Sequence, residues 1–185
     1  MTPDRFADLA GLFDEGGDPK WCSCMFFRLP GMTWRNASEQ SNRDDLERLS
    51  HNEVAPGLVA YRDELAIGWV GLAPRSEYGR LATSKVLKPI DDKPVWSIVC
   101  FVVSRHARRQ GVGHELLKAA VQYAQAHGAT IVEAYPVASE RGRVPAADAY
   151  HGTQSMFERA GFSVVDIRQW NATSPRRPIM RLELR

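Results

Sequence analysis

Apolar residues recur at helical spacing in four stretches of the chain. In the longest of them, leucine, alanine and valine occupy one side and charged or amide residues the other, and Gly128 follows where a helix-terminating glycine belongs. In a shorter, charged stretch, Asn42 stands where a polar cap would open a surface helix. The pattern predicts helices over residues 3–13, 42–51, 113–127 and 149–160.

Short apolar and aromatic runs predict strands between these helices. The run 95–103 is apolar at every position except Ser97, which is typical of a strand covered on both faces and central in its sheet. Two further runs are joined by Arg62-Asp63-Glu64 and predict a hairpin with a short charged turn. The predicted strands are 21–28, 57–61, 65–73, 95–103, 130–137, 162–170 and 179–184, and residues 74–94 are predicted to be a loop with one helical turn near Tyr78.

The order of these elements predicts a mixed α/β (α+β) fold with one three-layer core. The chain has 185 residues, of which 44% are hydrophobic and 25% charged, so we expect one globular domain over residues 1–185, with 1–19 as a helical lead-in. A formal net charge of +2 gives no general attraction to nucleic acid or to an anionic membrane. An anion site must therefore come from a local cluster of basic residues.

The three cysteines, Cys22, Cys24 and Cys100, are too few for a disulfide framework and lack the paired spacing of a zinc site. No apolar run approaches the roughly 20 residues that span a bilayer, and the first residues lack the basic-then-apolar layout of a signal peptide. We therefore expect a cytoplasmic protein with reduced thiols, no bound metal and no membrane partner.

Three arginines and two glycines crowd the stretch directly after the central predicted strand. Arg105, Arg108 and Arg109 precede Gly111 and Gly113, and the amphipathic helix begins there. Glycines at a helix start let backbone N–H groups and the positive end of the helix dipole approach an anion closely. The arginines add bidentate donors, so the stretch suits a pyrophosphate.

Two familiar phosphate motifs fit this stretch poorly. A P-loop needs Lys and then Ser or Thr after its second glycine, whereas Gly113 is followed by His114 and Glu115. A Rossmann motif needs a third small residue where Leu116 stands. A basic loop that only meets solvent is the structural alternative.

The segment Arg108-Arg109-Gln110-Gly111-Val112-Gly113 resembles the Arg/Gln-x-x-Gly-x-Gly/Ala signature of the GNAT acyltransferase superfamily. The strand before it, the Leu-Leu helix after it, the hairpin at 57–73 and the Phe157–Phe162 segment resemble the family's other elements in order, so the resemblance covers most of residues 20–185. It implies a central, mixed but mostly antiparallel sheet of about six to seven strands flanked by helices. It also implies acetyl-CoA, or another acyl-CoA, as co-substrate and an amine of a small molecule or protein as acceptor.

The resemblance also implies which residues bind the co-substrate. Backbone groups of Phe101, Val102 and Val103 would bond the pantetheine arm. The turn from Arg108 through Arg109, Gln110, Gly111, Val112 and Gly113 would hold the pyrophosphate, with His114 at its edge. Dimers are common in such families, so a homodimer is possible. A nucleic-acid partner is not expected, because the basic turn is small and the net charge low.

Acylation of an amine needs a general base and benefits from a proton donor to the leaving thiolate. Glu133, on the strand after the helix, is the carboxylate candidate for the base; its structural alternative is an ion pair with an arginine. The family's usual donor tyrosine corresponds to Phe157, and its helix-opening asparagine corresponds to Tyr150. Tyr150 is therefore the candidate donor, with Tyr135 as a second option, and either tyrosine could instead be a packing residue.

Cys100 has no neighbouring base in sequence, so we expect direct transfer without an acyl-enzyme. The loops 74–94 and 139–145, the second with Arg141 and Arg143, are expected to shape the acceptor site. A CoA-binding sensor or regulatory module without transferase activity is the alternative function, suggested by Phe157.

Overall fold

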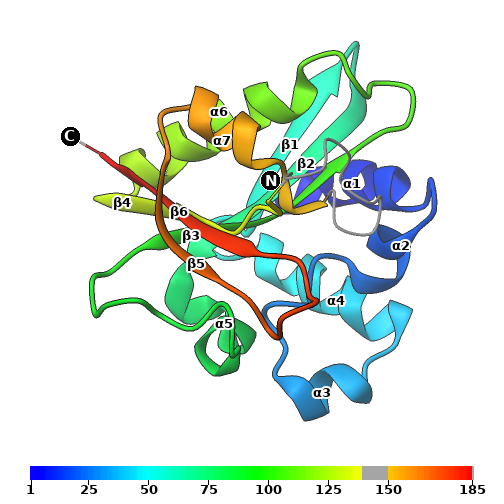
Figure 1. The fold of residues 1–185 in the computed structure, drawn as a ribbon. Coiled ribbons are helices and arrows are strands. Elements are labelled where there is room, and N and C mark those ends of the chain that lie inside the picture. The colour runs from blue at the N-terminus through cyan, green and yellow to red at the C-terminus, as the bar shows by residue number, and fades with distance from the viewer. Residues whose placement is uncertain (139–149, 185) are drawn as a thin grey trace.

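A computed structural model describes residues 1–138 and 150–184, and six strands in these residues form one sheet in the order β1-β2-β3-β4-β6-β5 (Figure 1). The strands are β1 (Gly57–Arg62), β2 (Leu65–Pro74), β3 (Trp96–Val103), β4 (Ile131–Ala134), β5 (Ser163–Arg168) and β6 (Arg177–Glu183). The helices are α1 (Phe6–Phe13), α2 (Asp18–Cys22), α3 (Gly31–Arg35), α4 (Glu39–Ser50), α5 (Gly79–Thr83), α6 (Val112–Ala126) and α7 (Gln154–Arg159), with 3-10 turns at Pro3–Arg5 and Arg75–Glu77.

Helices cover both faces of this sheet, so the core has three layers (Figure 1). The helices α6 and α7 pack on one face, and α1, α4 and α5 contribute to the apolar cluster on the other. A Cβ on Gly68 in β2 would lie 2.8 Å from Val112 and 2.9 Å from Leu116, so a glycine there lets α6 lie directly on the sheet. The predicted mixed, mostly antiparallel architecture is confirmed.

The two central strands pair for only part of their length. Strands β3 and β4 are the one parallel pair among the strands described, and α6 makes the crossover between them. Their register runs from Trp96 opposite Val132 to Ile98 opposite Ala134. β4 ends there, whereas β3 continues to Val103 while still paired with β2. The strands therefore separate beyond Ile98, and the end of β3 has one edge without a strand partner in the described residues.

Most predicted elements are confirmed. The first helix, the hairpin, the buried central strand, the long amphipathic helix and the last two strands form where the pattern places them. Asp63 and Glu64 in the hairpin turn both have positive φ, 47° and 67°, as a two-residue turn between right-twisted strands requires. No helix within the described ranges is long and apolar enough to cross a membrane.

The predicted strand over 21–28 is wrong. Residues Asp18–Cys22 form α2, and the chain then turns, with no strand in this segment. Its aromatic residues pack between helices and turns and not within a sheet. The rings of Phe26 and Trp34 meet edge-on with centroids 5.1 Å apart, and Phe27 is buried. An apolar aromatic run is compatible with a strand or with a packed turn, and its period does not distinguish them.

Three other boundaries also differ from the prediction. Helix α4 begins at Glu39 with Ser38 as its cap, while the Asn42 side chain is buried and donates to the carbonyl of Trp21. Strand β4 is limited to four residues, because the chain leaves β3 after Ala134. Helix α7 begins at Gln154, since Thr153 supplies the capping oxygen.

Candidate functional site

A tight turn joins the unpaired end of β3 to α6. Arg109 and Gly111 have φ of 59° and 84°, and Gly111 caps α6 in the left-handed conformation that glycine adopts freely. The backbone N–H groups of Gly111, Val112 and Gly113 have no acceptor among the residues the structure describes. They belong to the first helical turn, whose donors lack intrahelical partners and carry the positive end of the dipole. The turn thus presents free donors to an anion.

The same turn carries cationic side chains that no carboxylate neutralises within the described part of the chain. Arg105, Arg108 and Arg109 are exposed and form no ion pair there. Arg108 Nε donates to the carbonyl of Val103 at 3.3 Å, so its guanidinium lies by the end of β3. The Glu15 carboxylate accepts from the Ser104 hydroxyl at 2.7 Å and from the Arg105 backbone at 3.2 Å, which ties the turn to the end of α1.

The predicted pantetheine residues lead from the strand separation to this turn. Val102 and Val103 are half-buried, while Phe101 is buried and lies edge-on to Phe157, with ring centroids 6.1 Å apart. Phe157 itself is fully buried and also contacts Phe162. It is therefore a core side chain, and it carries no hydroxyl that could donate a proton.

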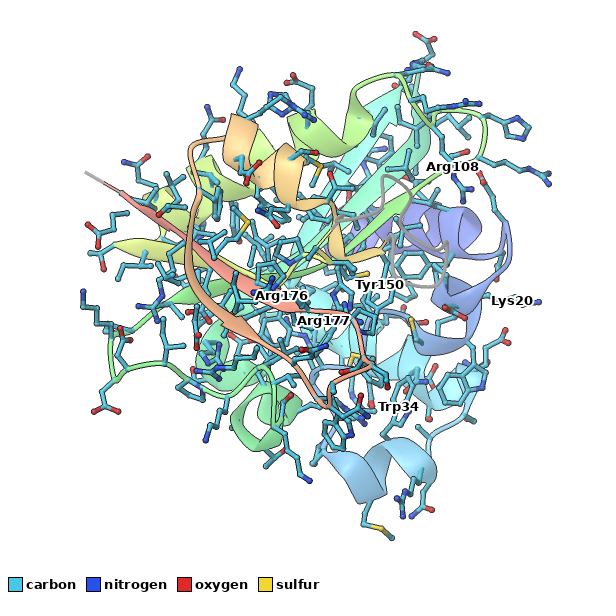
Figure 2. The ribbon with its side chains drawn as sticks, viewed as in Figure 1. Lys20, Trp34, Arg108, Tyr150, Arg176 and Arg177 are labelled. Atoms are coloured by element: carbon cyan, nitrogen blue, oxygen red, sulfur yellow. The ribbon has the colours of Figure 1, made fainter. Side chains whose placement is uncertain are left out.

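Tyr150 and His151 lie where β3 and β4 part. The two rings lie 4.0 Å apart between centroids, and His151 makes a hydrogen bond to the backbone of Val99, just past the last β3–β4 pair. His151 also contacts the ring of Phe27 at 5.7 Å. Tyr150 is half-buried, and in Figure 2 it lies between the turn that bears Arg108 and the start of β6.

His151 is held neutral. Burial, followed by the positive charge of Arg177, lowers the pKa of its imidazole to about 3, although the hydrogen bond to Val99 acts in the opposite direction. Its Nδ1 is buried and has no partner in the described ranges. Because the unfolded histidine binds a proton near its ordinary pKa of 6.5 and the folded one does not, stability is lost as the pH falls below about 6.5.

We expect the free energy of unfolding to fall by about 2 kcal/mol between pH 7.5 and pH 5 through His151 alone. Urea unfolding of the wild type and of His151→Gln at both pH values measures it, and the variant should lose most of this pH dependence. His51→Gln, at an exposed histidine, is the matched control. Equal pH dependence in wild type and His151→Gln would contradict the prediction.

The Glu133 carboxylate accepts three hydrogen bonds from side chains. Its Oε1 accepts from Arg75 Nη1 and from the Tyr135 hydroxyl, the latter at 2.7 Å, and its Oε2 accepts from Arg181 Nε at 2.7 Å. The Tyr135 hydroxyl also pairs with Ser97 on β3 at 2.7 Å. Burial, followed by the Glu133 charge, raises the pKa of Tyr135 well above its ordinary value.

The two arginines connect Glu133 to the loop between β2 and β3. Arg75 also donates to the carbonyl of Leu87, and Arg181 holds both oxygens of Asp91, at 2.6 and 3.0 Å. Hydrogen bonding by Arg181 lowers the pKa of the Asp91 carboxyl. Glu133 therefore forms an ion pair with each of two arginines. An arginine ion pair is the structural alternative to a role of Glu133 as the base.

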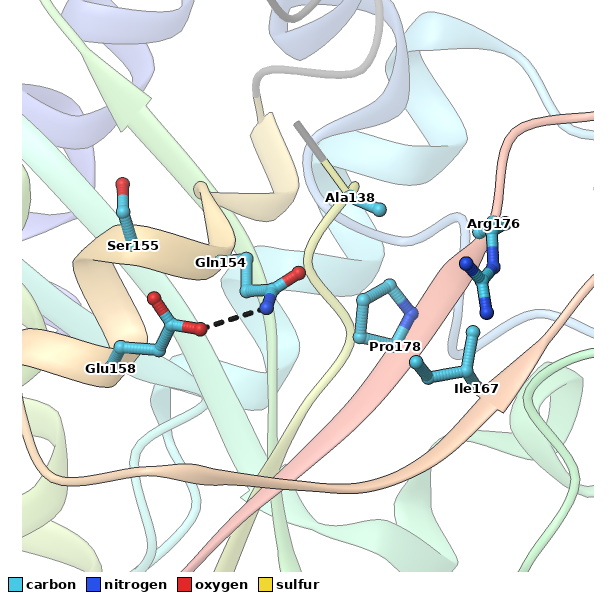
Figure 3. A pocket seen from close by; sticks show the side chains of 7 residues that line it. All are labelled: Ala138, Gln154, Ser155, Glu158, Ile167, Arg176 and Pro178. Carbon is cyan, nitrogen blue, oxygen red and sulfur yellow. Dashed lines mark hydrogen bonds between the residues drawn. The ribbon is translucent and has the colours of Figure 1, made fainter. Parts of the chain in front are cut away.

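A shallow pocket of about 340 Å³ lies beside α7 and the outer strands (Figure 3). Gln154 donates to Glu158 along its α7 side, and Arg176 and Ile167 line the other. None of the predicted co-substrate residues lines it. No cluster of three or more metal-ligating side chains occurs in residues 1–138 and 150–184. The expected acceptor residues Arg141 and Arg143, with the rest of 139–145, lie outside the described residues.

A family model described as the acetyltransferase (GNAT) family matches residues 24–162. The chain belongs to this family. The matched region includes the separating strands, the arginine turn and α7, so the resemblance drawn from the signature is confirmed. No curated protein sequence matches the chain.

Solved structures share the GNAT fold at low sequence identity. A GNAT-family protein from Desulfovibrio desulfuricans is 18% identical, with a TM-score of 0.56 over 98% of this chain and 93% of that chain. Ribosomal-protein-alanine N-acetyltransferase from Brucella melitensis is 16% identical, with a TM-score of 0.58 over 100% and 97%. The NatC complex bound to a Gag peptide and CoA is 13% identical, with a TM-score of 0.53 over 98% and 91%.

Sequence reasoning missed several residues that the fold brings to this site. The sequence pattern singles out none of His151, Arg75 and Arg181. Their partners lie far away in the chain, with 58 positions separating Arg75 from Glu133 and 48 separating Arg181 from it. The one local signal for buried arginines is Glu133 itself, because it is a charged residue within an otherwise apolar predicted strand and needs a partner if it is buried.

Proposed function

We propose that this GNAT-family chain is an acyl-CoA-dependent N-acyltransferase that transfers an acetyl group directly to an amine. The observation that carries the proposal is the continuity of two features: an unpaired strand edge on β3 leads straight into a turn with free N–H donors and three unneutralised arginines. A pantetheine arm pairs with such an edge, and a pyrophosphate suits such a turn.

The residues proposed to bind the co-substrate lie in two places, at the strand edge of β3 and in the turn before α6. Backbone groups of Phe101, Val102 and Val103 would bond the pantetheine amides. The turn would hold the pyrophosphate through the residues Arg108, Arg109, Gln110, Gly111, Val112, Gly113 and His114. The fit rests on N–H groups that meet no other acceptor in the described structure. The bound acyl-CoA supplies the activated thioester, whose carbonyl then lies near the strand separation.

Proton handling is assigned to two side chains. The amine nitrogen attacks the thioester carbonyl, the carbon–sulfur bond breaks, and we propose that the Tyr150 hydroxyl donates a proton to the departing sulfur. The amine's own proton must leave as well. We propose Glu133 as its destination through the Tyr135 hydroxyl, which donates a hydrogen bond to Glu133 Oε1 at 2.7 Å.

Acetyl-CoA binding tests the proposal directly. Calorimetric titration of the wild type should give a saturable 1:1 isotherm, and Gly111→Glu should weaken binding by at least about tenfold. A side chain at Gly111, where φ is 84°, strains the turn and adds a negative charge where the pyrophosphate would lie.

A matched control uses the other end of the same helix. Gly128 has φ of 81° and open space around its Cα, so Gly128→Glu introduces the same charge and similar backbone strain. We expect it to bind acetyl-CoA like the wild type. No binding by the wild type, or equal weakening in both variants, would overturn the proposed site.

To identify the acceptor, transfer of the label from labelled acetyl-CoA to each member of a panel of amines is measured. The panel starts from peptides with N-terminal alanine, the acceptor class in the name of the Brucella melitensis neighbour, and continues with amino acids and polyamines. Transfer that is lost in Gly111→Glu and kept in Gly128→Glu would identify the substrate.

A further inference from the structure

All three cysteines of the chain meet in one place, on the face of the sheet opposite α6. Cys24 and Cys100 are buried, and their sulfur atoms lie 2.8 Å apart although 76 positions separate them in sequence. The half-buried Cys22 hydrogen-bonds to Cys24, and the Trp69 indole donates to the Cys24 sulfur at 3.1 Å. The thiols therefore form a line from the half-exposed end of α2 to the central strand.

The backbone around Cys24 is held in an unusual conformation. Ser23 and Cys24 both have positive φ, 41° and 55°, in a segment without glycine or asparagine at those positions. Consecutive left-handed residues with side chains cost free energy and persist only where the surroundings hold them. This turn points the Cys24 thiol inward to Cys100 while leaving Cys22 at the surface side. Strain of this kind at a thiol pair suggests a function for the pair.

We propose that these cysteines form a thiol–disulfide exchange site. A low-molecular-weight disulfide, such as oxidised glutathione, is reduced there, and Cys24 and Cys100 are oxidised to a disulfide. The thiols are free in the structure. Cys22 is the entry thiol because it alone is not buried, and Cys100 is the final partner because its sulfur already touches that of Cys24.

The exchange balances in three displacements. The Cys22 thiolate attacks one sulfur of oxidised glutathione and releases one glutathione thiolate. Cys24 attacks the Cys22 sulfur and releases the second, and Cys100 then attacks Cys24 and frees Cys22. Two protein thiols each lose a proton, one sulfur–sulfur bond forms, and the two electrons reduce glutathione disulfide to two glutathione molecules.

The bond would join two parts of the proposed acyl-transfer site. Cys100 directly precedes Phe101, and Cys24 belongs to the turn that carries Phe27 against His151. A disulfide here would fasten that turn to the strand beside the cofactor without adding charge. It would also close a long loop, which constrains the unfolded chain.

The test incubates the protein with oxidised glutathione at pH 8.5, because the hydrogen bond to Cys24 and burial raise the pKa of the entry thiol Cys22, and burial raises the pKa of the Cys24 thiol, so that exchange is slow at neutral pH. We expect the intact mass to fall by two hydrogens and tryptic mapping to link Cys24 to Cys100. The thermal midpoint should rise by about 10 °C, and dithiothreitol should reverse it.

Three variants keep the proposal falsifiable. Cys24→Ser and Cys100→Ser should each abolish the linked peptide and the rise in midpoint, whereas Cys22→Ser should slow the reaction and reach the same end state. A wild type that stays fully reduced, carries only a glutathione adduct, or stops at a Cys22–Cys24 disulfide would overturn it. These readouts need no acetyltransferase activity, so they remain decisive if the proposed function fails.

Discussion

Glu133→Gln is expected to lower the free energy of unfolding by about 3–5 kcal/mol. Glu133 is 1% exposed and is the shared counter-charge of Arg75 and Arg181, both of which are largely buried. An amide carries no charge, and one of its two polar atoms is a donor that would face an arginine N–H. The thermal midpoint, measured by calorimetry at pH 7, should fall by about 10 °C.

Glu158→Gln is the matched control for this change. It removes the same charge from an exposed glutamate on α7 whose only described bond is to Gln154, so we expect a change within about 0.5 kcal/mol. Equal midpoints for Glu133→Gln and the wild type would contradict the structural role. Turnover measured well below the midpoint, where both proteins are folded, tests the proton-accepting role separately, and a wild-type kcat would exclude that role.

Tyr150→Phe is expected to lower kcat by about 100-fold while leaving the KM for acetyl-CoA within about twofold. The variant keeps the ring that stacks on His151 and removes only the hydroxyl. Phe157 cannot replace that hydroxyl, and the Tyr135 hydroxyl is already bonded to Ser97 and Glu133. Release of CoA thiol with the best amine of the panel measures the effect.

Tyr123→Phe serves as the control for the loss of a tyrosine hydroxyl. Tyr123 lies on the last turns of α6, away from the arginine turn, and its hydroxyl accepts from the Ala55 backbone. Its kcat should match the wild type. A Tyr150→Phe enzyme with unchanged kcat would remove Tyr150 as the proton donor and leave the co-substrate site untouched.

Features set by neighbouring residues could be predicted from the sequence. The hairpin turns at Asp63 and Glu64, and α6 begins at Val112 after its cap Gly111 and is followed by Gly128, because each of these features depends on the backbone preferences of a few adjacent residues. The apolar run of β3 predicted its central place for a similar reason, since only a strand covered on both faces has no polar side.

Features that depend on distant contacts could not be predicted in this way. The segment 21–28 has the composition of a strand, yet Phe27 packs on His151 and Asn42 bonds to Trp21, and these contacts decide its path. The expected base, Glu133, has its carboxylate engaged by Arg75 and Arg181, neither of which is a sequence neighbour.

Residue type and local backbone geometry are enough to indicate the family, the strand, turn and helix of the proposed anion site, and Phe157 in place of the family's usual tyrosine. Each of these features depends on a short stretch of the chain and needs no contact with a distant residue. The folded chain is needed to place Tyr150 and His151 at the strand separation, to pair Glu133 with two arginines, and to bring Cys22, Cys24 and Cys100 together. Those juxtapositions follow from packing between residues far apart in the chain, which periodicity does not record.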